Sequence, residues 1–367
     1  MRGQATFFEG IAPLIVSQPI RLVELFAGIG LQAKALENLG ARFEHYRVCE
    51  FDGNAIASYN AVHGTTFQAS DITQLHARDL GITETDRFTY IMTYSFPCQD
   101  LSNAGLGKGM KKGSGTRSGL LWEVERLLNE MDELPQILLM ENVPAIVNKN
   151  NVQDFADWCG TLEKLGYKSK WAVLNARDYG IPQNRERCFM VSWQGPYYFE
   201  FPEPVPLRTA LLDMLDDDVP EDFYVTGERL ERLLRMMRGS PGDWVNIRQA
   251  TEAGYIKCKI GGVANLSYPD SDTHRGRVCE DGDICPTIST KSGNLFRIEA
   301  SCDGNLVRIR KLTPKEFWRL MGFSDTDFEA AAKVNSKEQL YHQAGNSIVV
   351  DVLMAIFREM LCVEKAA

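Results

Sequence analysis

Cys98 is the first side chain whose type and setting suggest chemistry. It stands in the turn Phe96-Pro97-Cys98-Gln99, shortly after the apolar run Tyr90 to Tyr94. A proline fixes the backbone before the thiol, and a thiol that faces a cation or a helix N-terminus has a lowered pKa and acts as a nucleophile. The alternative is a buried structural cysteine, the commoner role for an arbitrary cysteine.

Glu141 follows a second apolar run, Ile137 to Met140. A carboxyl group beside apolar walls can stay protonated near neutrality and donate a proton. A buried capping carboxylate at a turn is the alternative interpretation.

Gln183, Arg185 and Arg187 alternate with a period of two. We expect them on one strand, where this spacing places their side chains on one face. Three convergent donors suit a phosphate or a base carbonyl, and an exposed polar face is the alternative.

The segment Phe26-Ala27-Gly28-Ile29-Gly30 follows the first apolar run, and its glycines allow a tight turn and close approach to a ligand. A dinucleotide fingerprint would need another glycine where Ala33 stands. Glu50 comes about 20 residues later, a spacing that suits hydrogen bonds to both ribose hydroxyls. Asp71 either holds an adenine amino group or caps the helix that follows.

These residues require a frame of alternating strands and helices. Apolar runs predict strands, and stretches with three-to-four spacing predict helices that cover the sheet. The pattern indicates an α/β fold with a doubly wound, mostly parallel sheet. The expected strands are Ile20 to Phe26, His45 to Cys49, Thr65 to Ala69, Tyr90 to Tyr94 and Ile137 to Met140, with a hairpin of Trp171 to Asn175 and Arg187 to Trp193. The expected helices are Gln32 to Leu39, Ala55 to His63, Gly119 to Asp132, Leu312 to Met321 and Ile348 to Met360.

A proline-rich stretch near residue 200 predicts a domain boundary. Beyond it the chain is rich in Gly, Ser, Asp and Thr, which indicates a smaller, irregular β-rich lobe. We therefore expect one domain from residues 1–200 and 326–367, and a second from residues 201–325.

The composition is that of an ordinary globular enzyme: 367 residues, 44% hydrophobic and 24% charged. Met1 to Ser17 has neither a long apolar stretch nor a cleavage site, so we expect no secretion, no membrane insertion and a cytoplasmic location. The nine cysteines form no C-x-x-C and have no nearby histidine pair in zinc spacing, so we expect no metal site.

The net charge of −9 argues against a nucleic-acid partner, because phosphate binding uses clustered Lys and Arg. The distribution is uneven, however. Residues 227–319 carry 16 Lys and Arg against 12 Asp and Glu, a modest local surplus of positive charge.

Taken in order, these segments resemble the motifs of the (cytosine-5)-methyltransferase family over most of the chain. The resemblance covers the loop from Phe26 to Gly30, the acids Glu50 and Asp71, the turn around Cys98, Glu141-Asn142-Val143 and the Q-x-R-x-R segment from Gln183 to Arg187. Farther on it covers Arg310 to Glu316, Arg319 to Phe323 and Gln343-Ala344-Gly345-Asn346-Ser347. Three positions depart from the usual pattern, namely Leu31, Ser95 and Leu101, and none of them removes a catalytic group.

The resemblance implies the chemistry of this family. Cys98 would add to C6 of a cytosine flipped out of duplex DNA, Glu141 would protonate N3, and Arg187 would hold O2. The methyl group would come from S-adenosylmethionine, leaving S-adenosylhomocysteine. The implied cofactor contacts are Phe26, Ala27, Gly28, Gly30, Glu50, Phe51, Asp71, Ile72, Pro97, Leu121, Asn346 and Ser347, and Gln183 and Arg185 join the catalytic set.

The Gly-rich stretch from Gly105 to Gly119 carries Lys108, Lys111, Lys112 and Arg117. Its composition suits either a lid that closes over DNA phosphates or a plain surface loop.

We further expect a monomer, with any cognate restriction endonuclease acting separately.

Three rival functions remain at this point. One branch of the same family methylates tRNA, but it has a short recognition lobe with a Cys-Phe-Thr signature, whereas this lobe is long and reads Ile284-Cys285-Pro286-Thr287-Ile288. A catalytically inactive DNA-binding relative is disfavoured because Cys98, Glu141 and Arg187 are all present. A nicotinamide-dependent oxidoreductase is disfavoured by the broken glycine fingerprint.

Overall fold

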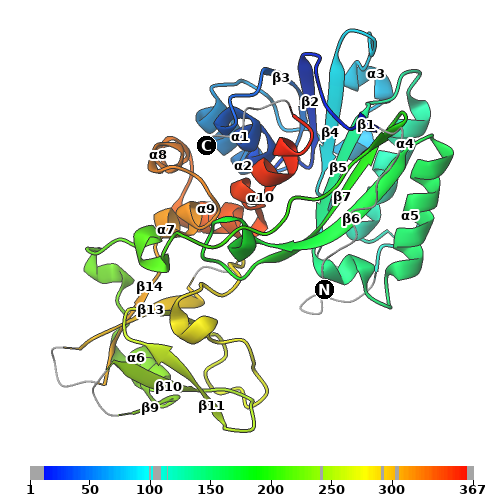
Figure 1. Ribbon diagram of the computed structural model, residues 1–367. Helices are drawn as coiled ribbons and strands as arrows, with labels where there is room; N and C mark the ends of the chain where they lie inside the picture. The colour runs from blue at the N-terminus through cyan, green and yellow to red at the C-terminus, as the bar shows by residue number, and fades with distance from the viewer. Residues whose placement is uncertain are drawn as a thin grey trace.

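The computed structural model of the chain describes residues 12–98, 101, 109–113, 115–239, 243–290, 293–301 and 306–361. Its centre is a six-stranded sheet in the order β3-β2-β4-β5-β7-β6 (Figure 1). The strands are β2 Ile20–Leu25, β3 Phe43–Cys49, β4 Thr89–Tyr94, β5 Ile137–Asn142, β6 Lys168–Asn175 and β7 Glu186–Trp193. The first four run parallel, and β6 and β7 form an antiparallel hairpin on β5. This confirms the doubly wound, mostly parallel sheet.

Helices cover both faces of the sheet. Alternate residues of each strand point to opposite faces, so each strand contributes side chains to two cores. On β2, Leu22 packs into one core and Val23 into the other. The first core is completed by α1 Leu31–Asn38, α2 Gly53–His63 and α10 Val350–Arg358, and the second by α3 Ala77–Leu80, α4 Leu121–Glu130 and α5 Val152–Lys164. In Figure 1 these two groups lie on opposite sides of the strands.

The strand predicted at Thr65 to Ala69 is wrong. This segment has no regular secondary structure, because its backbone bonds to a side chain instead of to a neighbouring strand. Asn60 receives the Phe67 backbone N–H on its Oδ1 and donates its Nδ2 to the Phe67 carbonyl, at 2.9 and 2.8 Å. Because the Asn60 side chain satisfies both backbone groups of Phe67, this residue does not need hydrogen bonds to a neighbouring strand.

The second lobe, from residue 225 to 311, is β-rich as expected and also contains a helix. It holds α6 Gly227–Leu234 and two three-stranded antiparallel sheets. The first sheet is made of β9 Met237–Arg238, β10 Trp244–Arg248 and β11 Tyr255–Lys259, and the second of β12 Val263–Asn265, β13 Leu295–Glu299 and β14 Arg308–Lys311. The side chains between these sheets form a third core, separate from the two that flank the large sheet.

Three further helices connect the lobe to the large sheet: α7 Pro314–Arg319, α8 Asp325–Ala332 and α9 Lys337–Asn346. The sequence predicted α7 and missed the other two. Phe317 and Trp318 of α7 are fully buried in the first core, so α7 packs with the sheet domain. Two short parallel strands, β1 Ala12–Pro13 and β8 Tyr197–Tyr198, form a separate two-stranded sheet.

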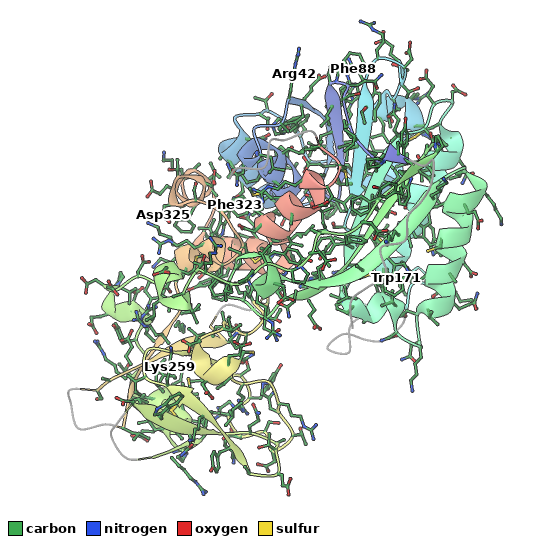
Figure 2. The ribbon with its side chains drawn as sticks, viewed as in Figure 1. Arg42, Phe88, Trp171, Lys259, Phe323 and Asp325 are labelled. Atoms are coloured by element: carbon green, nitrogen blue, oxygen red, sulfur yellow. The ribbon has the colours of Figure 1, made fainter. Side chains whose placement is uncertain are left out.

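A buried ion pair fixes the passage from β14 into α7. Arg310 donates to both carboxylate oxygens of Glu316, at 2.7 and 3.0 Å, and neither side chain is exposed. Glu316 also completes a capping box with Thr313 at the start of α7. In Figure 2 the labelled Phe323 and Asp325 mark this joint, between the sheet and the lobe that carries Lys259.

We expect Glu316→Gln to lower the free energy of unfolding by about 3 kcal/mol, the lower end for a broken buried pair, because the buried Arg310 charge then keeps Glu299, 3.0 Å from its Nε, as its carboxylate partner. Urea denaturation measures this change. Glu221→Gln is the matched control, since Glu221 pairs with Arg308 at the surface, where such pairs contribute about 0–1 kcal/mol. Equal losses in the two variants would contradict the role given to the buried pair.

None of the helices in the described ranges is long and apolar enough to cross a membrane. The seven cysteines in these ranges are all free thiols. Several expectations concern residues outside the described ranges: those on the N-terminal segment up to Ile11, on Gln99 and on Lys108.

Candidate active site

The parallel strands end in line, which brings the residues after them together. Leu25, Cys49 and Tyr94 occupy the same level of the sheet, and Met140 pairs with Tyr94. Phe26, Glu50, Ser95 and Glu141 therefore follow at one edge. Arg42 and Phe88, which directly precede β3 and β4, lie at the end of the molecule farthest from the second lobe in Figure 2, so the carboxyl ends point toward that lobe. Ligands of open α/β sheets bind at this edge.

Side-chain hydrogen bonds hold the turn that carries Cys98. The Asn142 amide donates to the Phe96 carbonyl at 2.9 Å, and the Ser118 hydroxyl donates to the Pro97 carbonyl at 2.7 Å. The sequence placed Asn142 in the motif around Glu141 without giving it a role, and it did not single out Ser118. Only the fold places them beside the turn, where they fix the direction of the thiol.

The Cys98 thiol is half-buried, and its pKa is raised instead of lowered as expected. Burial is the main cause, and the Glu141 carboxylate adds to it by repelling a thiolate. The positive charges of Arg187 and Arg185 oppose both effects without overcoming them. The thiol of the free protein is thus mostly protonated near neutrality.

Glu141 lies on β5 and forms an ion pair with Arg187 on β7, with its Oε1 3.1 Å from Arg187 Nε. Both side chains are largely buried. Burial raises the pKa of Glu141, and the opposing influence of Arg187, Arg185 and the Ser95 hydroxyl does not cancel it. This agrees with the expectation of a carboxyl group that can hold a proton near neutrality.

Gln183 and Arg185 do not share a strand face with Arg187, because β7 begins only at Glu186. Gln183 Nε2 donates to the Leu320 carbonyl at 2.7 Å, and its Oε1 accepts from the Ile288 backbone. Arg185 donates through its two terminal nitrogens to the carbonyls of Ile288, Gly345 and Ser347, at 2.6 to 2.9 Å. The two side chains tie three distant segments together, and Arg185 acts on Cys98 and Glu141 through its charge.

The loop after β2 is anchored to the acid after β3. Glu50 accepts the Gly28 backbone N–H on one oxygen and that of Asp52 on the other, both at 2.8 Å. Burial raises the pKa of Glu50. Phe26, Gly28 and Gly30 all have positive φ, and Gly30 is the N-cap of α1. A Cβ at Gly30 would collide with the rings of His63 and Tyr59, so only glycine fits there.

Three other expected cofactor contacts, Asp71, Ile72 and Phe51, differ in how exposed they are. Asp71 caps the short helix that follows it, accepting from the Thr73 backbone at 2.9 Å, and Ile72 is buried beneath. Phe51 is 77% exposed beside Glu50. An exposed aromatic ring next to a carboxylate offers a stacking surface for a flat ligand.

Four more of the expected cofactor contacts are Ala27, Leu121, Asn346 and Ser347. Ala27 donates its N–H to the Cys49 carbonyl at 3.1 Å, and Leu121 is buried at the start of α4. Asn346 ends α9 and is exposed, whereas the Ser347 hydroxyl donates to the Gln343 carbonyl at 2.6 Å. Arg185 links Ser347 to the segment before β7.

Lys111, Lys112 and Arg117 are the described cations of the expected lid, since residues 102–108 and 114 lie outside the described ranges. The Lys112 ammonium pairs with Glu125 of α4 and lies 5.3 Å from the Trp122 ring centroid. Its charge therefore already has a partner within the protein.

A family model supplies the decisive comparison. The model of the C-5 cytosine-specific DNA methylases matches residues 20–362, which include the six-stranded sheet, the second lobe and every motif described above. The chain belongs to this family. This methyltransferase is thus an enzyme that acts on C5 of cytosine in DNA, with S-adenosylmethionine as its cofactor.

Bacterial relatives align with the methyltransferase over nearly their whole lengths. The type II methyltransferase M2.ScrFI of Lactococcus lactis subsp. cremoris is 32% identical, with 93% of this chain and 99% of the relative covered. The orphan methyltransferase M.SssI of Spiroplasma monobiae is 31% identical, with 93% and 97% covered.

Solved structures show the same fold. The crystal structure of the S. pombe Dnmt2 methyltransferase has a TM-score of 0.63 at 18% identity, covering 93% of this chain and 97% of that one. At this identity the likeness concerns the fold alone.

Proposed function

We propose that this methyltransferase transfers a methyl group to C5 of a flipped-out cytosine within a specific duplex sequence, through a covalent bond between Cys98 and C6. The observation that carries the proposal is the arrangement of thiol, buried acid and arginine at one sheet edge. Cys98 and Glu141 follow neighbouring strands, and Arg187 forms an ion pair with Glu141.

The residues at the adjacent strand ends suit S-adenosylmethionine, which supplies an electrophilic methyl group when bound. Glu50 accepts backbone hydrogen bonds on both oxygens, and its carboxylate keeps acceptor capacity for a ribose hydroxyl. Phe51 offers its exposed ring to the adenine, and Asp71 and Ile72 flank it. Gly28 and Gly30 let the backbone approach the cofactor. Ala27, Phe26, Pro97, Leu121, Asn346 and Ser347 would complete the binding surface.

The protein's own groups then make C5 nucleophilic. The Cys98 thiolate forms a bond to C6 while Glu141 gives its proton to N3 and Arg187 binds O2. The addition moves the C5–C6 π electrons to the C4–C5 bond, which makes the ring an enamine. C5 of this enamine takes up the methyl group. Loss of the C5 proton to a base, with cleavage of the C6–S bond and return of the N3 proton to Glu141, restores the neutral ring and releases the thiolate.

The protonation state of Glu141 affects that of the Cys98 thiol. While Glu141 is ionised it raises the pKa of Cys98, so a carboxyl group that holds its proton for N3 also relieves the repulsion of the thiolate. Since C6 is inaccessible in a stacked duplex, the cytosine must leave the helix to reach this pair.

We infer that residues 201–325 contain the target-recognition domain, with residues 1–200 and 326–367 forming the catalytic one. Support comes from the separate core of the lobe, which spans Val225 to Ile309. Because α7 packs with the sheet, the recognition domain would end near Leu312, before the expected residue 325. Sequence-specific contacts would come from the lobe, through base edges in a groove of duplex DNA.

We also propose that the enzyme acts as a monomer. One relative is named a type II methyltransferase and another an orphan methyltransferase. A cognate restriction endonuclease, where one accompanies this chain, would therefore act as a separate protein.

We expect Glu50→Gln to weaken binding of S-adenosylhomocysteine by roughly 10- to 100-fold, because hydrogen bonds to a charged group contribute about 1.5–3 kcal/mol. Titration calorimetry measures the affinity. Glu44→Gln is the control, since Glu44 is an exposed carboxylate on β3, the strand that precedes Glu50, and pairs with Arg21. Unchanged affinity in the Glu50 variant would remove this residue from the cofactor site.

The function is tested by following labelled methyl from S-adenosylmethionine into unmethylated duplex DNA and into tRNA. We expect label in DNA alone. Label in tRNA alone would overturn the proposed substrate, and sequencing of the methylated cytosines in DNA would give the recognition sequence.

A further inference from the structure

Glu37, His45 and His63 converge directly behind the cofactor loop. They come from α1, β3 and α2, and their ligand atoms all lie within 4.8 Å of one another. Glu37 Oε1 is 2.7 Å from His63 Nδ1 and 3.5 Å from His45 Nε2. The two histidines are far apart in sequence, which is why their spacing predicted no metal site.

A buried hydrogen-bond chain orients His45. Its Nδ1 lies 2.9 Å from the Tyr59 hydroxyl, which is itself 2.5 Å from Glu24 Oε2. The hydroxyl gives its single proton to the carboxylate, so it accepts from His45 Nδ1–H. The opposite ring nitrogen, Nε2, is thereby directed toward Glu37.

A backbone carbonyl orients His63 in the same way. Its Nε2 lies 3.2 Å from the Ile29 carbonyl, which can only accept, so this nitrogen carries a proton. The His63 side chain is fully buried, and its Nδ1 donates a hydrogen bond to the same Glu37 oxygen, 2.7 Å away, with a proton that a bound cation would replace. Metal-binding histidines typically have their far nitrogen fixed by such a carbonyl or hydroxyl partner.

The second oxygen of Glu37 is held separately. Lys34 Nζ lies 3.1 Å from Oε2 and 2.7 Å from Asp327 of α8, so the lysine charge is matched by Asp327. Oε1 remains the oxygen that both histidines face. Glu37 and His45 are partly exposed, which leaves an approach from solvent.

From this geometry we infer that Glu37, His45 and His63 form a binding site for a divalent transition-metal ion of the zinc type. Two imidazoles and one carboxylate are a common zinc set, with water as the fourth ligand, and nitrogen donors disfavour Mg²⁺ and Ca²⁺. The ion would join α1, β3 and α2. Through the His63 contact with Ile29 it would also stiffen the cofactor loop. This inference stands independently of the proposed function.

The test is equilibrium dialysis of the chelator-treated full chain against Zn²⁺, followed by metal analysis. We expect one Zn²⁺ per chain, and binding at least roughly tenfold weaker in both Glu37→Gln and His45→Gln, since loss of an outer partner alone costs about 10- to 100-fold. Tyr59→Phe, which keeps all three ligands, should weaken binding within that range. His76→Gln is the matched control: His76 also faces a carboxylate, Glu130, at 3.5 Å, but belongs to no such triad.

Absorption of the Co²⁺-loaded protein distinguishes these ligands from the cysteines. We expect a spectrum without thiolate-to-cobalt charge transfer. A thiolate band, no Zn²⁺ binding by the wild type, or binding undiminished in the Glu37 and His45 variants would overturn the inference. Thermal melting in chelator shows that the variants are folded before their affinities are compared.

Discussion

Cys98→Ala is expected to abolish methyl transfer to DNA, by about four orders of magnitude or more, the scale of losses when a covalent nucleophile is removed. Without the thiol nothing adds to C6, and C5 of cytosine remains a poor nucleophile. The fold should persist, because the turn is held by Asn142 and Ser118 and not by the thiol. Transfer of labelled methyl under single-turnover conditions measures the effect.

Cys159→Ala provides the comparison for this variant. Cys159 is also a free, half-buried thiol, but it lies on α5 against Met190. We expect its loss to leave transfer nearly unchanged. Residual transfer in the Cys98 variant similar to that of the Cys159 variant would show that the thiol is not the nucleophile.

Glu141→Gln is expected to change two measurable rates in opposite directions. Methyl transfer should fall by roughly 10²- to 10⁴-fold, the usual contribution of a general acid, because an amide cannot give a proton to N3. Alkylation of Cys98 should become faster at mildly alkaline pH. The carboxylate that adds to the effect of burial on the pKa of this thiol is gone, so the charge of Arg187 lowers that pKa without opposition from Glu141.

Mass spectrometry of the Cys98 peptide after iodoacetamide treatment measures the second rate. A merely unfolded variant would also expose the other cysteines, so their alkylation serves as the internal control. Slower alkylation of Cys98 in the glutamine variant would contradict the electrostatic coupling between the two groups.

Local patterns were sufficient to predict the sheet and the placement of the residues that follow its strands. Apolar runs identified β2, β4 and β5, and parallel strands that end in register place the following residues side by side. The positions of Glu50, Cys98 and Glu141 at one edge follow from this rule alone. The two runs Trp171 to Asn175 and Arg187 to Trp193 likewise identified the hairpin of β6 and β7.

Long-range partners account for what the sequence could not predict. Gln183 and Arg185 continue the period of a strand, yet their donors are used by carbonyls more than 100 residues away. Thr65 to Ala69 has strand-forming residues, but the Asn60 side chain replaces the neighbouring strand. The pKa of Cys98 depends on burial and on Glu141, and neither is visible in the turn itself.

The central claim, a covalent bond from Cys98 to the target base, is tested most directly with random-sequence duplex DNA that contains 5-fluorocytosine. Fluorine at C5 cannot leave as a proton, so after methyl transfer the C6–S bond cannot be cleaved and the complex persists through denaturation. We predict that this adduct forms only with S-adenosylmethionine present and maps by peptide mass spectrometry to Cys98. An adduct on another residue, or none from an enzyme that methylates ordinary DNA, would contradict the account.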